Sequence, residues 1–323
     1  MKLLRGLRNF PDFTRGTVTT IGNFDGVHLG HQALLKTLRA EASLLEMPTV
    51  VLLFEPQPAE YLRPEQSPAR LTTLREKLAV LKNCQVDYVI CLKFNEKLAL
   101  MSAQDFAEHY FFSTLNSKFL LIGEDFRFGK GRLGDVSLLT QLGTNHDCKV
   151  QTFPDFSIKT NRVSSTKTRD ALGQGDLEAA SQLLGRTFSL CGRVVKGDGR
   201  GRQWGIPTAN LSMQRLKLPL KGVFCVQVKR NGGKLLNGIA NLGTRPTVDG
   251  SKNILEIHLF DFDESLYGEM LQVFFLHKLR DEVKFSSVDA LIDQIHIDVA
   301  SARLEFSTSR FTLNLDLNPG ILN

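Results

Sequence analysis

The spacing of apolar residues changes near residue 185, and this change constrains the fold more than any other feature. Upstream of it, the apolar, β-branched run at residues 49–54 lies between stretches with helical spacing at residues 30–47 and 71–84. Further strand-like runs at 86–94 and 117–126, and helical stretches at 102–115 and 164–185, continue the alternation. A continuous apolar run is typical of a strand buried on both faces. Because strands that alternate with helices form a parallel, doubly wound sheet, we predict an α/β domain over residues 1–185.

Downstream of residue 185, strand-like runs follow one another without intervening helices. They occupy residues 188–195, 222–230, 234–243, 254–262 and 270–280. Asn231, Gly232 and Gly233 suit a hairpin turn, because they tolerate positive φ. Such a succession of short strands predicts an antiparallel barrel. Apolar residues then recur at helical spacing, so we expect one helix to close the second domain: Val288, Leu291, Ile292, Ile295 and Val299. We place this domain at residues 186–306 and leave residues 307–323 as an unassigned tail.

Net charge and cysteine content limit which ligands, metals and cellular location we expect for this protein. The net charge of +6 is spread along the chain, which suits small phosphorylated ligands with fewer assumptions than nucleic acid. The five cysteines are odd in number and never form Cys-x-x-Cys, so neither a disulfide framework nor a structural zinc site is expected. The first residues have no apolar leader, and no run approaches 18 apolar residues. We therefore expect a cytoplasmic protein that binds neither membrane nor nucleic acid, as a monomer or weak homo-oligomer.

A glycine-rich turn, "TIGNFDGVHLGHQALL" at residues 20–35, leads from a strand-like run at residues 17–24 into the helix expected at residues 30–47. His28 and His31 stand three apart where free backbone N–H groups and the helix dipole favour an anion. Gly22, Gly26 and Gly30 would let the backbone approach that anion closely. Two alternatives stay open. The histidines could be capping or surface residues, or they could bind zinc, although a third ligand is missing nearby.

The segment "GNFDGVHLGHQ" resembles the His-x-Gly-His signature of the adenylyl-transferring nucleotidyltransferase superfamily, which has a Rossmann-like sheet. "GEDFRFG" at residues 123–129 and "SSTKTR" at 164–169 fit the same superfamily, although Thr168 stands where an aliphatic residue is usual. The resemblance implies that His28 and His31 are catalytic, binding the triphosphate and stabilising charge at the α-phosphate. It implies ATP contacts by Gly22, Asn23, Phe24, Asp25, Gly30, Ser164, Ser165, Thr166 and Arg169, the last four holding the β- and γ-phosphates.

One further glycine motif competes with this interpretation. "GKGRLG" at residues 129–134 satisfies G-x-G-x-x-G, which could indicate a nicotinamide cofactor. We discount it, because no βαβ unit surrounds it and because Lys130 and Arg132 suggest a mobile basic loop. The chain also contains no Walker sequence, so its phosphates are held in another way.

The second domain carries its own glycine-rich stretch, "GRVVKGDGRGRQWGIPTANL" at residues 192–211. A flexible loop is one explanation and an RNA-binding arm another, although the chain lacks interleaved aromatic and basic residues. Thr208 and Asn210 stand two apart on an extended segment, so both side chains project to one side and could reach one Mg²⁺-nucleotide. Glu256 lies between apolar neighbours. It is either a paired structural charge or a working base.

These segments, with "GIANLGTRPT", "LEIHLFDF" and "LYGEMLQVFFLHKLRDEVKF", closely resemble riboflavin kinase, a six-stranded barrel. The resemblance implies that Thr208 and Asn210 bind Mg²⁺ and ADP phosphates and that Glu256 is the general base. Gly199, Gly205 and Pro207 are assigned to the same nucleotide site.

Taken together, residues 17–306 resemble the bacterial bifunctional riboflavin kinase/FAD synthetase family. The resemblance implies two steps: phosphorylation of riboflavin to FMN by ATP, then adenylylation of FMN to FAD with release of pyrophosphate. Mg²⁺ is the implied cofactor. We assign FMN contacts in the first domain to Phe54, Pro56, Asp125, Phe126 and Phe128, with Phe128 able to stack a flavin ring. Two rivals stay open: an adenylyltransferase acting on another phosphorylated vitamin, and a nucleic-acid-binding module that uses residues 199–203 and binds in a salt-dependent way.

Overall fold

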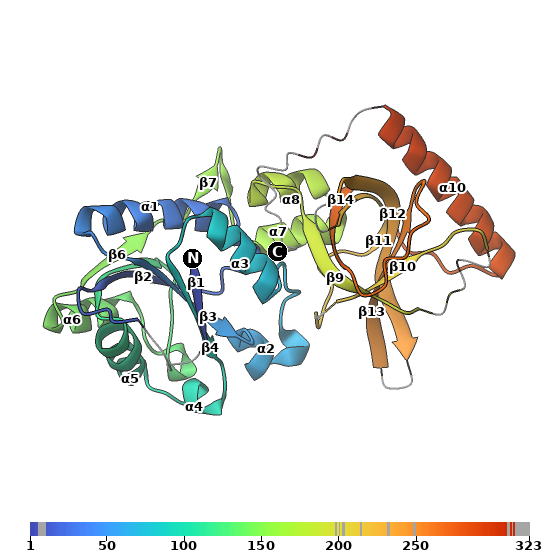
Figure 1. The fold of residues 1–323 in the computed structure, drawn as a ribbon. Helices are drawn as coiled ribbons and strands as arrows, with labels where there is room; N and C mark the ends of the chain where they lie inside the picture. The colour runs from blue at the N-terminus through green and yellow to red at the C-terminus, as the bar shows by residue number, and fades with distance from the viewer. Residues whose placement is uncertain are drawn as a thin grey trace. The chain divides into compact units, whose positions relative to one another are not determined.

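The chain forms two compact units that do not follow the order of the sequence. The computed structural model describes residues 1–5, 11–197, 199, 201, 204–213, 215–230, 233–247, 250–308, 311 and 313 (Figure 1). The first unit contains Met1–Pro68 and Val80–Val163, and the second contains Ala69–Ala79 and Ser164–Asn323. The cut therefore falls before the expected boundary at residue 185, and a short segment of the N-terminal half packs with the C-terminal half.

The first unit is built on a six-stranded sheet in the order β1-β4-β3-β2-β5-β6, with every neighbouring pair parallel. Its strands are β1 Lys2–Arg5, β2 Thr17–Ile21, β3 Thr49–Glu55, β4 Tyr88–Lys93, β5 Ser117–Gly123 and β6 Lys149–Phe153. Its helices are α1 Leu29–Leu45, α2 Pro58–Leu62, α4 Glu96–Ala99, α5 Ala103–Phe106 and α6 Val136–Asn145. Short elements complete it: η1 Asp25–Val27, η2 Pro64–Gln66, the π-helical η3 Ala107–Thr114, η4 Lys130–Arg132, β7 Ser157–Ile158 and β8 Asn161–Arg162.

The two central strands are buried on both faces, which explains their continuous apolar character. Every residue of β2 is buried, and so are the first five of β3. Val50 and Leu52 pack in one apolar cluster with Phe106 of α5 and Leu139 of α6, while α1 lies over the other face (Figure 1). The doubly wound parallel sheet is confirmed. The carboxyl ends of β3, β2 and β5 are neighbours at one edge, where ligands of such sheets bind.

Some local predictions for this unit were wrong or incomplete. The helix expected at residues 102–115 is short α5 continued by the π-helical η3. The edge strands β1 and β6 were not predicted, because β1 is only four residues long and β6 is partly exposed along its length. Helical spacing puts Leu45 on the same face as Leu38 and Ala42, which are buried, but Leu45 is the last residue of α1 and is 41% exposed.

The second unit contains a closed barrel in the order β10-β13-β12-β11-β14-β9. Its strands are β9 Ser189–Val195, β10 Ala209–Ser212, β11 Gly222–Lys229, β12 Leu235–Thr247, β13 Gly250–Leu259 and β14 Met270–Arg280. Its helices are α7 Ser165–Gln174, α8 Leu177–Leu184 and α10 Val288–Ser307, together with the first residues of α3 Leu74–Asn83. All six strand pairs are antiparallel, so the predicted barrel is confirmed.

Helix ends in this unit follow the glycines of the sequence. Gly175, at φ +80°, ends α7, and Gly185, at φ +70°, ends α8, because both take the left-handed conformation that glycine adopts without strain. The closing helix α10 packs Ile295 and Val299 against the barrel, but Val288 at its start is 55% exposed. Asn231 and Gly232 of the expected hairpin turn, and most of the tail after residue 308, lie outside the described residues.

Candidate functional sites

The turn between β2 and α1 brings the two histidines of the first motif together. His28 is the N-cap of α1, and its Nδ1 accepts a hydrogen bond from the backbone N–H of His31 at 3.3 Å. The two imidazole rings stack, with centroids 3.7 Å apart and planes 17° apart. Phe24 lies against His31 at 4.8 Å between centroids. The capping alternative is therefore correct for His28. It leaves the anion role open, because a cap uses only one ring nitrogen.

The glycines of this turn are needed for its shape. Gly26 has φ +80°, and a Cβ at Gly30 would lie 3.2 Å from the ring atoms Cε1 and Nδ1 of His28. A Cβ at Gly22 would meet the Phe24 ring at 3.2 Å. Any side chain at Gly22 or Gly30 therefore presses on an aromatic ring of the motif. Phe24 and Asp25 are each 2% exposed, whereas Asn23 is exposed to solvent.

The residues assigned to the flavin differ in how accessible they are. Phe126 and Phe128 stack with planes 10° apart and centroids 5.4 Å apart, but Phe128 is only 7% exposed and also packs on Phe106. Phe126, which is half-buried, is the more accessible ring of the pair. Phe54, at the end of β3, packs edge-on against Phe94, and Pro56 follows in a cis peptide bond with Glu55. Asp125 is exposed and lies 3.8 Å from Arg162.

In the loop with the competing glycine motif, residues 129–134, several backbone groups already form hydrogen bonds within the protein. Phe128 and Gly134 exchange backbone hydrogen bonds of 3.0 and 2.9 Å, which close the loop, and Lys130 N–H donates to the Met101 carbonyl at 2.8 Å. The helix that follows, α6, is capped by Asp135, whose Oδ1 accepts from the N–H of Leu138 at 3.0 Å. A carboxylate at that helix end repels a phosphate, so the motif does not form a dinucleotide site there.

The third nucleotidyltransferase segment forms the start of α7 in the second unit. Ser164 is the N-cap, and its hydroxyl accepts from the N–H of Lys167 at 3.2 Å while keeping its own proton to donate. Thr168 is fully buried, and its hydroxyl donates to the Ser164 carbonyl at 2.9 Å, so the unusual residue satisfies its own polar group. Arg169 donates from Nε to the carbonyl of Ala69 at 2.6 Å.

In the barrel, the loop before β10 folds around Thr208 and Asn210. The backbone N–H groups of Trp204 and Ile206 both donate to the Gly201 carbonyl, at 3.2 and 2.8 Å. A Cβ at Gly197 would lie 2.4 Å from Nδ2 of Asn210, and a Cβ at Gly201 would lie 3.2 Å from Oγ1 of Thr208. These glycines therefore lie directly against the Thr and Asn side chains. Gly199 and Gly205, at φ +71° and +74°, take conformations that favour glycine.

The register of the barrel strands places Glu256 beside Asn210. Asn210 of β10 and Glu256 of β13 are direct cross-strand partners, and Glu256 is also paired with Asn241 of β12. Directly opposite residues of antiparallel strands carry their Cβ atoms about 5 Å apart on the same face. Because Leu255 and Ile257 point into the barrel core, the three polar side chains share its outer face. The sequence reasoning missed Asn241. Its place between the core residues Ala240 and Leu242 indicates an outward-facing side chain but not its pairing with Glu256.

His258, two residues after Glu256 on β13, fixes the loop beside these polar side chains. Its Nδ1 donates to the carbonyl of Pro207 at 2.9 Å, which ties β13 to the residue before Thr208. Among the residues that the structure describes, no three His, Cys, Asp or Glu side chains gather as a metal site. In the described part of the chain, no helix combines the length and apolar composition needed to cross a bilayer.

The comparisons with known proteins match both halves of the chain. The FAD synthetase family model matches residues 10–167, and the riboflavin kinase family model matches residues 184–306. The chain is 44% identical over 308 residues to the bifunctional riboflavin kinase/FMN adenylyltransferase of Haemophilus influenzae, covering 95% of this chain and 100% of that protein. It is 46% identical over 311 residues to the protein of the same name from Escherichia coli K12, covering 96% and 99%.

A solved structure has a similar fold over nearly the full length of the chain. It is entitled a macrolide-efflux protein from Streptococcus pneumoniae, and it aligns with a TM-score of 0.78 and 29% identity over 97% of this chain and 100% of that one.

A nucleotidyltransferase sheet followed by a kinase barrel defines the class: a two-domain transferase that acts on flavins and ATP. The chain belongs to the bifunctional riboflavin kinase/FMN adenylyltransferase family. It phosphorylates riboflavin to FMN and adenylylates FMN to FAD. This displaces the rival with a single adenylyltransferase activity.

Proposed function

We propose that His28 and His31, at the start of α1, hold the triphosphate of ATP during adenylylation. The phosphate of FMN attacks the α-phosphorus of ATP, and the bond to the pyrophosphate oxygen breaks. A phosphate dianion is already nucleophilic at neutral pH, so this step needs positioning and charge stabilisation more than a base. Gly22, Asn23, Phe24, Asp25 and Gly30 complete this end of the nucleotide site.

The cap geometry supports a definite role for His28. Because its Nδ1 accepts the N–H of His31, the proton of the neutral ring lies on Nε2. His28 then donates from Nε2 to a phosphate oxygen without giving up the cap. In the same reaction, Ser164, Ser165, Thr166 and Arg169 hold the β- and γ-phosphates, which is supported by the free donor of the Ser164 hydroxyl and by the helix start at α7.

In the barrel, we propose that Glu256 is the general base of riboflavin phosphorylation. The carboxylate takes the proton of the riboflavin 5′-hydroxyl while that oxygen attacks the γ-phosphorus of ATP and ADP leaves. The single observation that carries this assignment is the register of Asn210, Glu256 and Asn241 across three strands. It brings a carboxylate to an outer face of the barrel where Asn210 of the Pro-Thr-Ala-Asn segment also lies.

The donors of this site fit Mg²⁺. Thr208 and Asn210 offer a hydroxyl and an amide oxygen beside a carboxylate, and Mg²⁺ prefers oxygen ligands while keeping several waters. When bound, the ion would neutralise charge on the transferring phosphates. Thr208 and Asn210 would hold it, and Gly199, Gly205 and Pro207 would shape the loop around the nucleotide.

For the flavin of the adenylylation site we propose contacts by Phe54, Pro56, Asp125, Phe126 and Phe128. The greater exposure of Phe126 supports it as the ring that stacks on the isoalloxazine, with Phe128 as its buried support.

We propose functional boundaries at 1–185 for adenylylation and 186–306 for kinase activity, with 307–323 as a tail. We also propose a cytoplasmic location, supported by Cys148, Cys191 and Cys225, which form no disulfide. We also propose a monomer or weak homo-oligomer, which sedimentation velocity tests directly.

Two complementary variants test the assignment of residues to reactions. With His28 and His31 both changed to Ala, the enzyme should convert riboflavin to FMN and accumulate it without making FAD. With Glu256→Gln, riboflavin phosphorylation should fall roughly 10²- to 10⁴-fold while supplied FMN is still adenylylated. Products are separated by chromatography. FAD formation at the normal rate by the double variant would show that the first site is misassigned, and equal loss of both activities in Glu256→Gln would remove the base assignment.

A further inference from the structure

A buried ion pair joins the two family-matched regions inside the second unit. Glu76 lies within the stretch that matches the FAD synthetase model, and Arg215 lies within the stretch that matches riboflavin kinase. Both nevertheless belong to one compact unit, and their side chains are 1% and 0% exposed. We propose that Glu76 and Arg215 are positioning residues for the riboflavin kinase site. This inference rests on the proposed assignment of Asn210 and Glu256 to that site.

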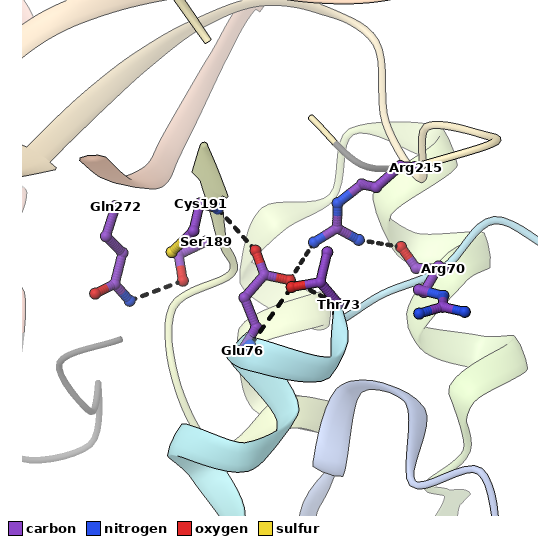
Figure 2. Close-up of polar contacts among 7 residues, drawn as sticks. All are labelled: Arg70, Thr73, Glu76, Ser189, Cys191, Arg215 and Gln272. Carbon is purple, nitrogen blue, oxygen red and sulfur yellow. Dashed lines mark hydrogen bonds and ion pairs between the residues drawn. The ribbon is translucent and has the colours of Figure 1, made fainter. Parts of the chain in front are cut away.

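Glu76 is fixed from its own helix. Thr73 and Glu76 form a capping box at the start of α3: Thr73 N–H donates to Oε2 of Glu76 at 2.6 Å, and Glu76 N–H donates to Oγ1 of Thr73 at 3.4 Å. The same Oε2 accepts from the guanidinium of Arg215, and Oε1 accepts from the backbone N–H of Cys191 at 2.7 Å. Figure 2 shows Glu76 between Cys191 on one side and Arg215 on the other. One carboxylate therefore serves three partners in three segments of chain.

Arg215 is fixed by the same short segment. Besides Glu76, its guanidinium donates to the backbone carbonyl of Arg70 (Figure 2). Its own carbonyl accepts from Nδ2 of Asn253 at 2.8 Å. A buried guanidinium whose carboxylate is removed keeps its charge and loses its compensation, which is strongly unfavourable. The backbone around Arg215 is therefore expected to move rather than leave that charge unpaired.

The three tethered segments lead directly to the proposed kinase residues. Arg215 follows the end of β10 by three residues, and β10 carries Asn210. Asn253 precedes Glu256 by three residues on β13. Cys191 lies on β9, which pairs with β10 through Asn210 and Val195. Thus β9, β10 and β13 are all held from one point, and Asn210 and Glu256 are paired between two of them.

Cys191, whose backbone N–H binds Glu76, lies among buried groups. Burial raises the pKa of its thiol well above the ordinary value, and the negative charge of Glu76 raises it further. On the adjacent strand, the buried Gln272 donates from Nε2 to the hydroxyl of Ser189 at 3.1 Å (Figure 2). Cys191 itself is half-buried, and its backbone N–H is satisfied by Glu76.

The test uses the full-length enzyme with Glu76→Gln, Arg215→Met and the double variant. Each single change leaves one member of the pair without its counter-charge, so kcat for riboflavin phosphorylation should fall at least roughly tenfold at a temperature where the protein is fully folded. Adenylylation of supplied FMN should stay within about threefold, because Arg169 bonds the backbone of Ala69 and not Glu76. In the double variant no uncompensated charge is left, so kcat should partly recover.

Asp298→Asn is the matched control, because it breaks another arginine–carboxylate pair with a buried carboxylate in the same unit, between α10 and β14. Asp298 is 4% exposed and accepts from Arg280 at 2.7 to 3.0 Å. Both kinds of variant should lower Tm by several degrees, but only the Glu76 and Arg215 variants should lower kinase kcat.

Three results would overturn the proposal. The first is a loss of Tm without a change in kinase kcat or KM, and the second is an equal loss of both activities. The third is an equal kcat loss in Asp298→Asn. Glu256→Gln, measured in parallel, separates a failure of this inference from a failure of the kinase-site assignment. If that variant keeps normal kinase activity, the site itself is wrong.

Discussion

Replacing His28 with Asn or Ala separates the two roles that the structure gives to this side chain. As the N-cap of α1, His28 satisfies one backbone N–H at 3.3 Å. Loss of a cap costs about 1 kcal/mol, which corresponds to a Tm lower by about 2–4 °C in a domain of this size. Asn is among the best N-cap residues, so His28→Asn should keep the cap and leave the Tm unchanged. His28→Ala should lose the cap and lower the Tm. Neither variant supplies the imidazole Nε2–H.

The catalytic cost should therefore be shared by both variants. Removing one donor to charge that develops in a transition state lowers kcat by about 10²- to 10³-fold, or about 2.7–4 kcal/mol. We expect FAD formation from FMN and ATP to fall by that factor in His28→Asn and His28→Ala alike, while riboflavin phosphorylation on the same chain is unchanged. Rates are measured by chromatography and Tm by circular dichroism. If His28→Asn makes FAD at the normal rate, the histidine is a cap and nothing more.

Two further predictions follow from close contacts and burial. Gly197→Ala should lower riboflavin kinase activity by roughly 10²-fold, since its Cβ would lie 2.4 Å from Asn210 Nδ2. Gly173→Ala, where a Cβ meets nothing within 4 Å, is the control and should leave kinase initial rates unchanged. Burial raises the pKa of Cys148 and of Cys225 to about 12, so at pH 8 only about one thiol in ten thousand is the reactive thiolate. Mass spectrometry should find both unalkylated by iodoacetamide in the native enzyme and alkylated in urea, and rapid native labelling would contradict their burial.

The strands and helices with strong periodicity were predictable, because burial on both faces leaves a pattern in the residues themselves. β3 shows five consecutive buried residues, and α7 and α8 end at the glycines that the sequence offers. The edge strands were not predictable in this way. β1 is four residues long with both end residues exposed, so its apolar content carries no period. The π-helical turn in η3 also has no signal in "AEHYFFST" that we can identify.

The candidate sites were predictable only where chemistry is local. The pair of His28 and His31 is contained in one turn, and the sequence places both. Asn241 was missed because its partnership with Glu256 depends on strand register, which a single sequence does not fix. Glu76 was missed for a stronger reason. It lies in a segment that sequence periodicity assigns to the first domain, while its partners belong to the barrel.

This long-range partnership also affects synthesis of the protein. Glu76 leaves the ribosome 139 residues before Arg215 and 115 residues before Cys191. At a synthesis rate of about 5–20 residues per second, Arg215 is made roughly 7–28 s after Glu76. During that interval the segment 69–79 has no folded barrel to join. Within the nascent N-terminal half, residues 69–79 can therefore complete their folding only when the last third of the chain has been made.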